Sequence, residues 1–183
     1  MKLTIAVTGA SSIVLAKRLL EVLKEKGVET HLVASDASKK VMEYEGISYS
    51  DLKSLASEVH EINEIDASIA SGSFKMDGMV VVPCSMKTLG GLASGYSKNL
   101  ILRAGDVCLK QENKLVLVPR ETPLNYIHLK NMLTLKKAGA TILPANMAFY
   151  FKPETLDDMI NFIIGKILDS FEIEHELYKR WEK

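Results

Sequence analysis

The stretch that decides the fold lies at the start of the chain: Leu3-Thr4-Ile5-Ala6-Val7-Thr8-Gly9-Ala10-Ser11-Ser12. Its first half is a short apolar run of the kind that forms a buried strand. Its second half allows a tight turn at Gly9 and supplies the hydroxyls of Ser11 and Ser12, just before a helical pattern over residues 13–23. Free N–H groups at such a helix start attract phosphate. The stretch therefore predicts either an anion-binding strand end or a plain turn with an N-capping serine.

The same pattern of strand followed by helix recurs along the chain. Further β-like runs, most of them continuously apolar, occupy residues 30–34, 79–83, 115–118 and 141–143. The clearest helix is an apolar stripe over residues 156–171, where Thr155 and Asp158 have the spacing of a capping box. The alternation predicts a single α/β domain with a doubly wound, mainly parallel sheet of the Rossmann or flavodoxin type. Ligands of such sheets bind beyond the carboxyl ends of the strands, where the strand order reverses.

The composition excludes several classes of protein. The 183 residues carry 23 basic and 23 acidic side chains, which argues against nucleic acid as the main partner because such a protein needs a basic face. Two cysteines, Cys84 and Cys108, are too few for the disulfide framework of a secreted protein. No apolar run approaches the roughly 18 residues that a membrane helix needs. We therefore expect one soluble, cytoplasmic domain over residues 1–183, with a C-terminal tail from about residue 172.

Two further strand ends carry candidate chemistry. PCSMKT at 83–88 gathers hydroxyls and Lys87 where a helix begins near Ser85. Within it, Cys84 is either a nucleophile or a small buried residue, and the lack of a nearby histidine favours the second. Arg120 and Glu121 are either a solvated ion pair or ligand-facing groups, and their strand-end position favours the ligand. The histidines are far apart in the sequence and form no metal-binding motif, so we predict no metal site from them: His31, His60, His128 and His175.

An ordered set of motifs resembles the flavin prenyltransferase family, the UbiX-like flavoproteins. The motifs are TGAS at 8–11, ASGS at 70–73, PCSMKT at 83–88, Asn99-Leu100, Arg103-Ala104, Asp106-Val107, Leu109-Lys110, LVLVPRETP at 115–123, HLKNML at 128–133, GATILPA at 139–145 and Phe149-Tyr150. The similarity extends from Thr8 to Trp181. The related FMN-binding cysteine decarboxylases resemble the chain less, because their PASANT loop carries an asparagine that PCSMKT lacks.

The resemblance implies an enzyme that joins reduced FMN to dimethylallyl phosphate without a metal. The product would be prenylated FMN, the cofactor of a separate decarboxylase. By the matching motifs, FMN would contact Gly9, Ala10, Ser11, Ser35, Ser85, Met86, Lys87, Thr88 and Arg120. The prenyl phosphate site would comprise Ser71, Gly72, Arg103, Lys110, Glu121, Tyr150, Lys166 and Trp181. Three residues would lie closest to the chemistry: Ser11, Glu45 and Glu121.

Three features depart from the family pattern, one of which is the segment Ser12-Ile13-Val14-Leu15, which is bulkier than usual. Ser12 replaces a common second glycine, which would stiffen the first loop, and Lys166 replaces a common arginine, which keeps the charge but loses the bidentate fork. Two other functions stay open: a module that stores FMN or prenylated FMN and delivers it to a decarboxylase, and an FMN-dependent decarboxylase of the same fold. The full set of phosphate-holding cations together with Glu121 favours the prenyltransferase, because storage needs no prenyl phosphate site.

The resemblance also implies a homo-oligomer, commonly a dodecamer built from trimers, whose active sites form between subunits. The tail holds the only tryptophan of the chain, Trp181. Trp181 either packs on its own domain or closes a prenyl pocket beside Tyr150 and Lys166. A large, rigid tryptophan is a favoured interface anchor, which supports the second arrangement.

Overall fold

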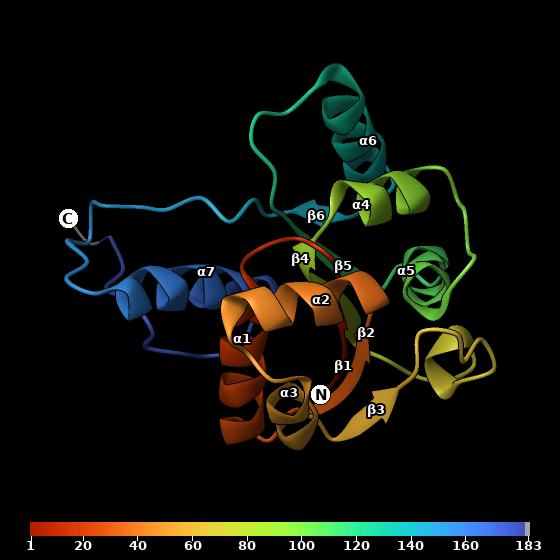
Figure 1. The fold of residues 1–183 in the computed structure, drawn as a ribbon, viewed down its shortest axis with the longest axis horizontal. Coiled ribbons are helices and arrows are strands. Elements are labelled where there is room, and N and C mark those ends of the chain that lie inside the picture. The colour runs from red at the N-terminus through yellow and green to blue at the C-terminus, as the bar shows by residue number, and fades with distance from the viewer. Residues whose placement is uncertain (182–183) are drawn as a thin grey trace.

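The computed structural model describes residues 1–181, which fold around one six-stranded sheet with the strand order β3-β2-β1-β4-β5-β6 (Figure 1). The strands are β1 (Lys2–Val7), β2 (Glu29–Ala34), β3 (Glu58–His60), β4 (Gly78–Cys84), β5 (Lys114–Pro119) and β6 (Thr141–Ile142). The helices are α1 (Ile13–Glu25), α2 (Asp36–Glu45), α3 (Tyr49–Leu55), α4 (Met86–Ala93), α5 (Leu100–Lys110), α6 (Tyr126–Lys137) and α7 (Leu156–Ser170), with a 3-10 turn η1 (Ser68–Ala70). All neighbouring strands of this sheet pair in parallel. The chain runs outward from β1 to β3 and then crosses back to β4, so the strand order reverses between β1 and β4 and the doubly wound fold is confirmed.

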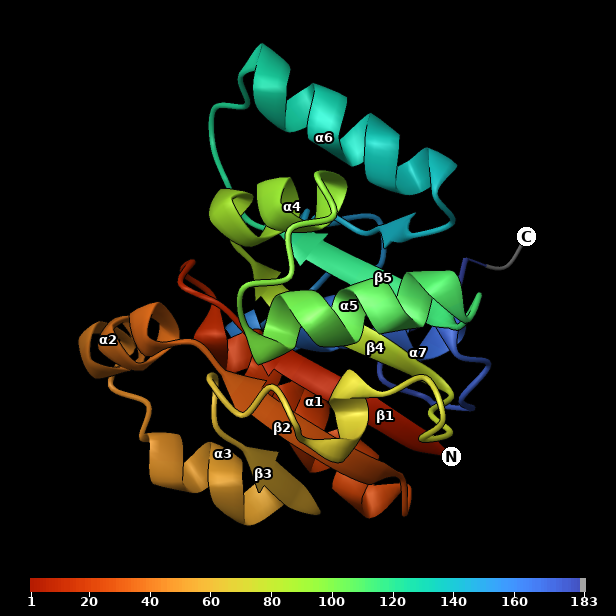
Figure 2. The same cartoon turned by 90° about the vertical axis from the view of Figure 1, so that its right-hand side faces the viewer.

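Helices cover both faces of the sheet, which is why its central strand β4 is apolar and buried along its whole length. Successive side chains of a strand point to opposite faces. Ile5 and Val80 pack with α1 and α7 on one face, whereas Val81 and Leu117 pack with α4 and α5 on the other. Figure 2 shows α5 in front of the sheet and α1 behind it.

All five strands predicted from the apolar runs occur, with small differences at their ends. The sixth strand, β3, was not predicted because it has only three residues and begins with the exposed Glu58. The predicted capping box of α7 is present. The Asp158 amide donates to the Thr155 hydroxyl (3.2 Å), and the Thr155 amide donates to the Asp158 carboxylate (2.9 Å).

After α7 the chain folds back against that helix. Asp169 accepts hydrogen bonds from the Tyr178 hydroxyl (2.8 Å) and the Arg180 guanidinium (2.7 Å). Trp181 packs edge-on against Tyr150, with ring centroids 5.5 Å apart, and is still 74% exposed. Trp181 thus contacts its own domain and keeps most of its surface free. In the described part of the chain, we find no helix long and apolar enough to cross a membrane.

Candidate active site

A pocket opens at the carboxyl edge of the sheet, where the strand order reverses. It has a volume of about 320 Å³ and is lined by Gly9, Ala10, Ser11, Val41, Ser85, Met86, Arg120 and Glu121. The loops after β1, β4 and β5 supply all of these residues except Val41, which lies on α2, and Met86, which begins α4. The structure therefore brings together most of the residues expected to contact FMN, although they come from distant parts of the sequence.

Thr8 holds the first two of these loops together, a role that the sequence analysis missed. Its buried hydroxyl donates to the Pro83 carbonyl (2.7 Å) and accepts from the Ser85 amide (2.7 Å). These bonds fix the end of β1 to the beginning of α4. The signal in the sequence was weak, because a threonine at the end of a strand is equally suited to close a turn by itself.

The first turn of α4 is open toward the pocket. Ser85 is its N-cap and accepts from the Thr88 amide (3.4 Å), while the Met86 and Lys87 amides have no acceptor among the described residues. The positive end of the helix dipole, the free amides and the Lys87 ammonium together favour an anion. Ser35 caps α2 in the same way, accepting from the Ser38 amide (3.1 Å).

The first turn of α1 is closed, which corrects our prediction for this loop. The Ser12 and Ile13 amides donate to the two carboxylate oxygens of Glu45, at 2.7 and 2.8 Å. The side chain of Ser12 makes no capping hydrogen bond, and its backbone is left-handed with φ 84°. The amides expected to attract phosphate therefore already bind a carboxylate from the end of α2. The left-handed conformation also explains why a glycine suits position 12.

Arg120 and Glu121 are exposed and line the pocket. No ion pair joins them within residues 1–181, so the ligand-facing arrangement is favoured over a solvated pair. Glu121 also lines an adjoining cavity of about 170 Å³ with Pro144 and Asn146. Glu121 thus lines both cavities at this edge of the sheet.

Cys84 is fully buried, and burial raises the pKa of its thiol to about 12. A thiol with this pKa is not ionised at neutral pH and cannot act as a nucleophile. The prediction that Cys84 is a small buried residue is therefore confirmed.

A second group of expected site residues lies at the opposite edge of the sheet. Ser71 and Gly72 precede the beginning of β4, and Lys110 ends α5 just before β5 begins (Figure 2). A Cβ added to Gly72 would lie 3.3 Å from the Lys110 Cε, so the loop lies directly on the end of α5. Arg103 joins this group by donating from its Nε to the Ala70 carbonyl (3.1 Å).

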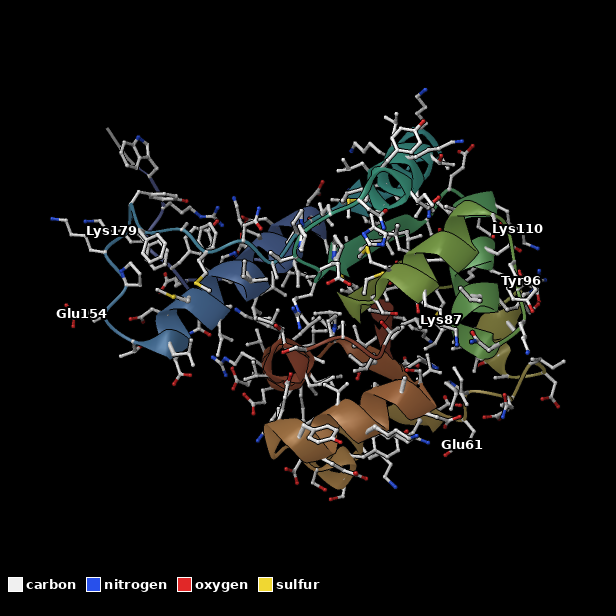
Figure 3. The ribbon with its side chains drawn as sticks, turned by 45° about the horizontal axis from the view of Figure 1, so that its top comes forward. Glu61, Lys87, Tyr96, Lys110, Glu154 and Lys179 are labelled. Atoms are coloured by element: carbon white, nitrogen blue, oxygen red, sulfur yellow. The ribbon has the colours of Figure 1, made fainter. Side chains whose placement is uncertain are left out.

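A third group surrounds the end of α7. Lys166 lies 3.6 Å from the Asp169 carboxylate, and both line a groove of about 500 Å³ that also includes Pro144 and Asn146. Tyr150 and Trp181 stack edge-on nearby, on the segments that precede and follow α7. In Figure 3, Lys179 of this region and Lys110 of the second group lie on opposite sides of the molecule.

Comparisons with known proteins place the chain among flavoproteins. The Flavoprotein family model matches residues 1–168. The chain is 48% identical over 182 residues to flavin prenyltransferase UbiX of Methanocaldococcus jannaschii, covering 99% of this chain and 98% of that relative. The solved structure of AnUbiX (PadA1), in complex with FMN and dimethylallyl pyrophosphate, matches with a TM-score of 0.98 at 44% identity, covering 100% of this chain and 97% of that one.

A second solved structure is a dodecameric FMN-dependent UbiX-like decarboxylase from Escherichia coli O157:H7. It matches with a TM-score of 0.97 at 47% identity, covering 100% of both chains. The similarity covers the whole chain, and the polar strand ends of the fold form one pocket. Together these findings assign the chain to a family. The chain belongs to the flavin prenyltransferase family of flavoproteins.

Proposed function

We propose that this protein transfers the dimethylallyl group of dimethylallyl phosphate to reduced FMN and so makes prenylated FMN. The observation that carries the proposal is the pocket where the loops after β1, β4 and β5 meet, in a chain of the flavin prenyltransferase family. The FMN and dimethylallyl pyrophosphate bound to AnUbiX support the choice of both substrates.

The pocket suits FMN in its chemistry. Gly9 and Ala10 have little or no side chain, so a ring system can approach the backbone closely. The open start of α4 with Ser85 and Lys87, and the Arg120 guanidinium, provide donors and positive charge for a phosphate. Met86, Thr88 and Ser35 complete the residues that we expect to contact FMN.

Reduced FMN supplies the nucleophilic N5 and then the C6 that accept the dimethylallyl group. The chain's own task is to help the allylic C–O bond break and to exclude water. Arg103, Lys110 and Lys166 balance the growing charge of the leaving phosphate. Glu121 exchanges a proton with that phosphate, and we expect Ser11 and Glu45 to act close to the reacting atoms of the flavin. Tyr150 and Trp181 offer π faces to the developing allyl cation.

These residues cannot all serve one pocket within a single chain. Ser71, Gly72 and Lys110 lie at the amino edge of the sheet, whereas the pocket opens at the carboxyl edge. A side chain cannot reach across the length of the strands, so we infer that this group completes the pocket of a neighbouring subunit.

Exposed apolar side chains support assembly into a homo-oligomer. Four of them lie on α6: Tyr126, Ile127, Leu129 and Leu133. Two more, Met147 and Phe149, lie on the segment between β6 and α7. Apolar surface of this kind is typical of a protein interface. We therefore propose a higher homo-oligomer, with a dodecamer built from trimers as the specific form.

The product is an altered cofactor that this chain does not itself use, so we propose that a prenylated-FMN-dependent decarboxylase receives it. A cytoplasmic location remains our expectation. The test is to mix the protein with reduced FMN and dimethylallyl phosphate without oxygen and to measure the mass of the flavin after denaturation. We expect a flavin heavier by one dimethylallyl unit. Recovery of unchanged FMN would support the storage module instead.

The transfer should need reduced flavin but no divalent metal. Oxidised flavin is a poor nucleophile at N5, and the cationic side chains replace magnesium as the counter-charge of the phosphate. We expect the same yield of product with and without a chelator. Activity that vanishes with the chelator and returns with magnesium would contradict this part of the proposal.

A further inference from the structure

Two buried histidines meet at the edge of the sheet that lies beyond β2, outside the flavin pocket. His31 is on β2 and His60 ends β3, and their side chains are 0% and 3% exposed. The parallel register pairs His31 with Glu58 and Val33 with His60, which brings residues 29 positions apart in the sequence next to each other. Their role is not explained by the proposed prenyl transfer.

Three potential ligands converge at this point. The His31 Nδ1 lies 3.0 Å from the His60 Nε2 and 3.5 Å from a carboxylate oxygen of Glu58. The other Glu58 oxygen lies 3.7 Å from the His60 Nε2. Zinc-ligand bonds of the usual length place neighbouring ligand atoms of a tetrahedral site about 3.3 Å apart. The two Glu58 distances involve different oxygens, but one ligand atom from each of the three side chains lies within 4.8 Å of the other two, so small side-chain rotations bring them to three corners of a tetrahedral site.

The outer nitrogens of both rings face carboxylates. The His31 Nε2 lies 3.1 Å from Glu29, which is also paired with Lys2 at 2.9 Å, and the His60 Nδ1 lies 3.9 Å from Glu64. Metal-bound histidines typically donate their outer N–H to a carboxylate, which fixes the tautomer and turns the other lone pair toward the metal. Donation from His31 to Glu29 leaves its Nδ1 as such a lone pair.

The two inner nitrogens lie at the distance of an N–H···N hydrogen bond, in which one ring donates its proton to the other. The ring planes differ by only 7° and the centroids are 5.3 Å apart, so the nitrogens face each other almost in line, as in an N–H···N hydrogen bond. With both outer nitrogens protonated, the two inner lone pairs would repel at this distance, so metal binding requires the nitrogens to move slightly apart and both lone pairs to turn toward the ion. A metal ion would take the place of the shared proton, which would move to the His60 Nδ1 facing Glu64, after a modest turn of each ring.

We propose that His31, His60 and Glu58 bind one divalent transition-metal ion, for which Zn²⁺ is the best match. Two imidazole nitrogens and one carboxylate oxygen are a ligand set that suits zinc. The carboxylates of Glu29, Glu58 and Glu64 surround the site and favour a cation. An ion can enter from solvent, because the Glu58 side chain is 55% exposed.

The bound ion would hold the short edge strand β3 against β2 rather than take part in the chemistry of the flavin pocket. The chain that follows β3 runs through η1 to the Ser71–Gly72 loop, and Phe74 of this segment packs edge-on against His31, with ring centroids 5.4 Å apart. Zinc would thus stabilise the segment that carries part of the prenyl phosphate site. Prenyl transfer itself would still proceed after chelation.

The experiment titrates Zn²⁺ into the full-length protein, first freed of metal, and follows binding by calorimetry, with the absorption of Co²⁺ as a second probe of tetrahedral coordination. We expect one ion per chain and a rise in the midpoint of thermal unfolding. His60→Gln should weaken binding by roughly a hundredfold, since even the loss of an outer partner costs 10–100-fold. His128→Gln is the matched control: His128 lies outside the site, in the capping box of α6, where glutamine is equally suitable.

Glu58→Gln is a second site variant, which we expect to fold normally because the side chain is more than half exposed and glutamine has the same size. Retention of FMN by each variant confirms that it is folded. We expect Glu58→Gln to lose most of the zinc affinity while His128→Gln keeps it. If wild type binds zinc no better than either site variant, or if His128→Gln loses binding equally, the histidine pair holds only a proton and the proposal is wrong.

Discussion

The two helices that follow β1 and β4 begin at the same edge of the sheet, but different groups occupy their first turns. The first amides of α1 bind the carboxylate of Glu45, whereas the first amides of α4 face the pocket beside Ser85 and Lys87. Both helix starts carry the same partial positive charge. One is neutralised by a side chain of the protein itself, and the other is available to a ligand.

The same contrast distinguishes two carboxylates in this region, Glu45 and Glu121. Glu45 is half-buried and holds two amides, so its charge stabilises the fold. Glu121 is exposed, and within residues 1–181 its carboxylate accepts only from the amide of Thr122 (3.0 Å), so its charge is available for chemistry. Variants at the two positions should therefore fail in different ways.

The largest effect is expected at Glu121. Glu121→Gln keeps the size of the side chain but removes the group that exchanges a proton with the phosphate, so turnover should fall on the order of a hundredfold. The affinity for FMN and the free energy of unfolding should stay close to those of wild type, which flavin titration and urea unfolding will measure. Glu25→Gln, at an exposed position at the end of α1, is the control. Unchanged turnover in Glu121→Gln would leave Glu121 without a role in catalysis.

Glu45→Gln should instead lower stability. The change replaces a charged acceptor of two amides at a helix start by a neutral one, which should reduce the free energy of unfolding by about 1.5–3 kcal/mol. Urea unfolding measures this loss, with Glu43→Gln on the exposed face of α2 as the control. Equal stability of the two variants would mean that Glu45 does not close α1, and the contrast with α4 would disappear.

The C-terminal tail lies away from both helix starts and offers a third test. Removing residues from Tyr178 onward deletes Trp181 and the bonds from Tyr178 and Arg180 to Asp169. We expect normal FMN binding but a roughly tenfold loss of kcat/KM for dimethylallyl phosphate, as for the loss of an interface anchor. Removal of residues 182–183 alone is the control. A fully active monomer in light scattering, or an unchanged kcat/KM after truncation, would contradict the assembly that we propose.

The smallest effect is expected at Ser12. The left-handed backbone of Ser12 destabilises the folded state by about 1 kcal/mol, because the residue has a Cβ. Ser12→Gly removes this strain but raises the conformational entropy of the unfolded chain, which offsets part of the gain. The net result should be a gain of about 0.5 kcal/mol in the free energy of unfolding. Thermal and urea unfolding of wild type and variant will measure it. A clear loss of stability would show that the serine hydroxyl supports the loop.

Most of the fold could be predicted from local sequence. Strands β1, β4 and β5 are mostly apolar in sequence, which predicts cover on both sides, and α7 carries both an apolar stripe and its own capping box. Because parallel strands align their carboxyl ends, the same patterns also predicted that the loops at Ser11, Ser85 and Arg120 would meet. Strand β3 escaped prediction because its three residues are held by pairing with β2, not by an apolar run.

What the sequence by itself determined is thus five of the six strands, the first and last helices, the edge of the sheet where a ligand binds and, through the ordered motifs, the family. What only the tertiary structure decided is which groups satisfy one another across long separations. Glu45 closes α1 from 33 positions away, Thr8 joins two loops, and His31 meets His60 across β2 and β3. The physical reason is the range of the interactions: apolar periodicity is set by neighbours in the chain, whereas a hydrogen bond needs its partner within about 3 Å in space. Only the packed fold fixes that distance.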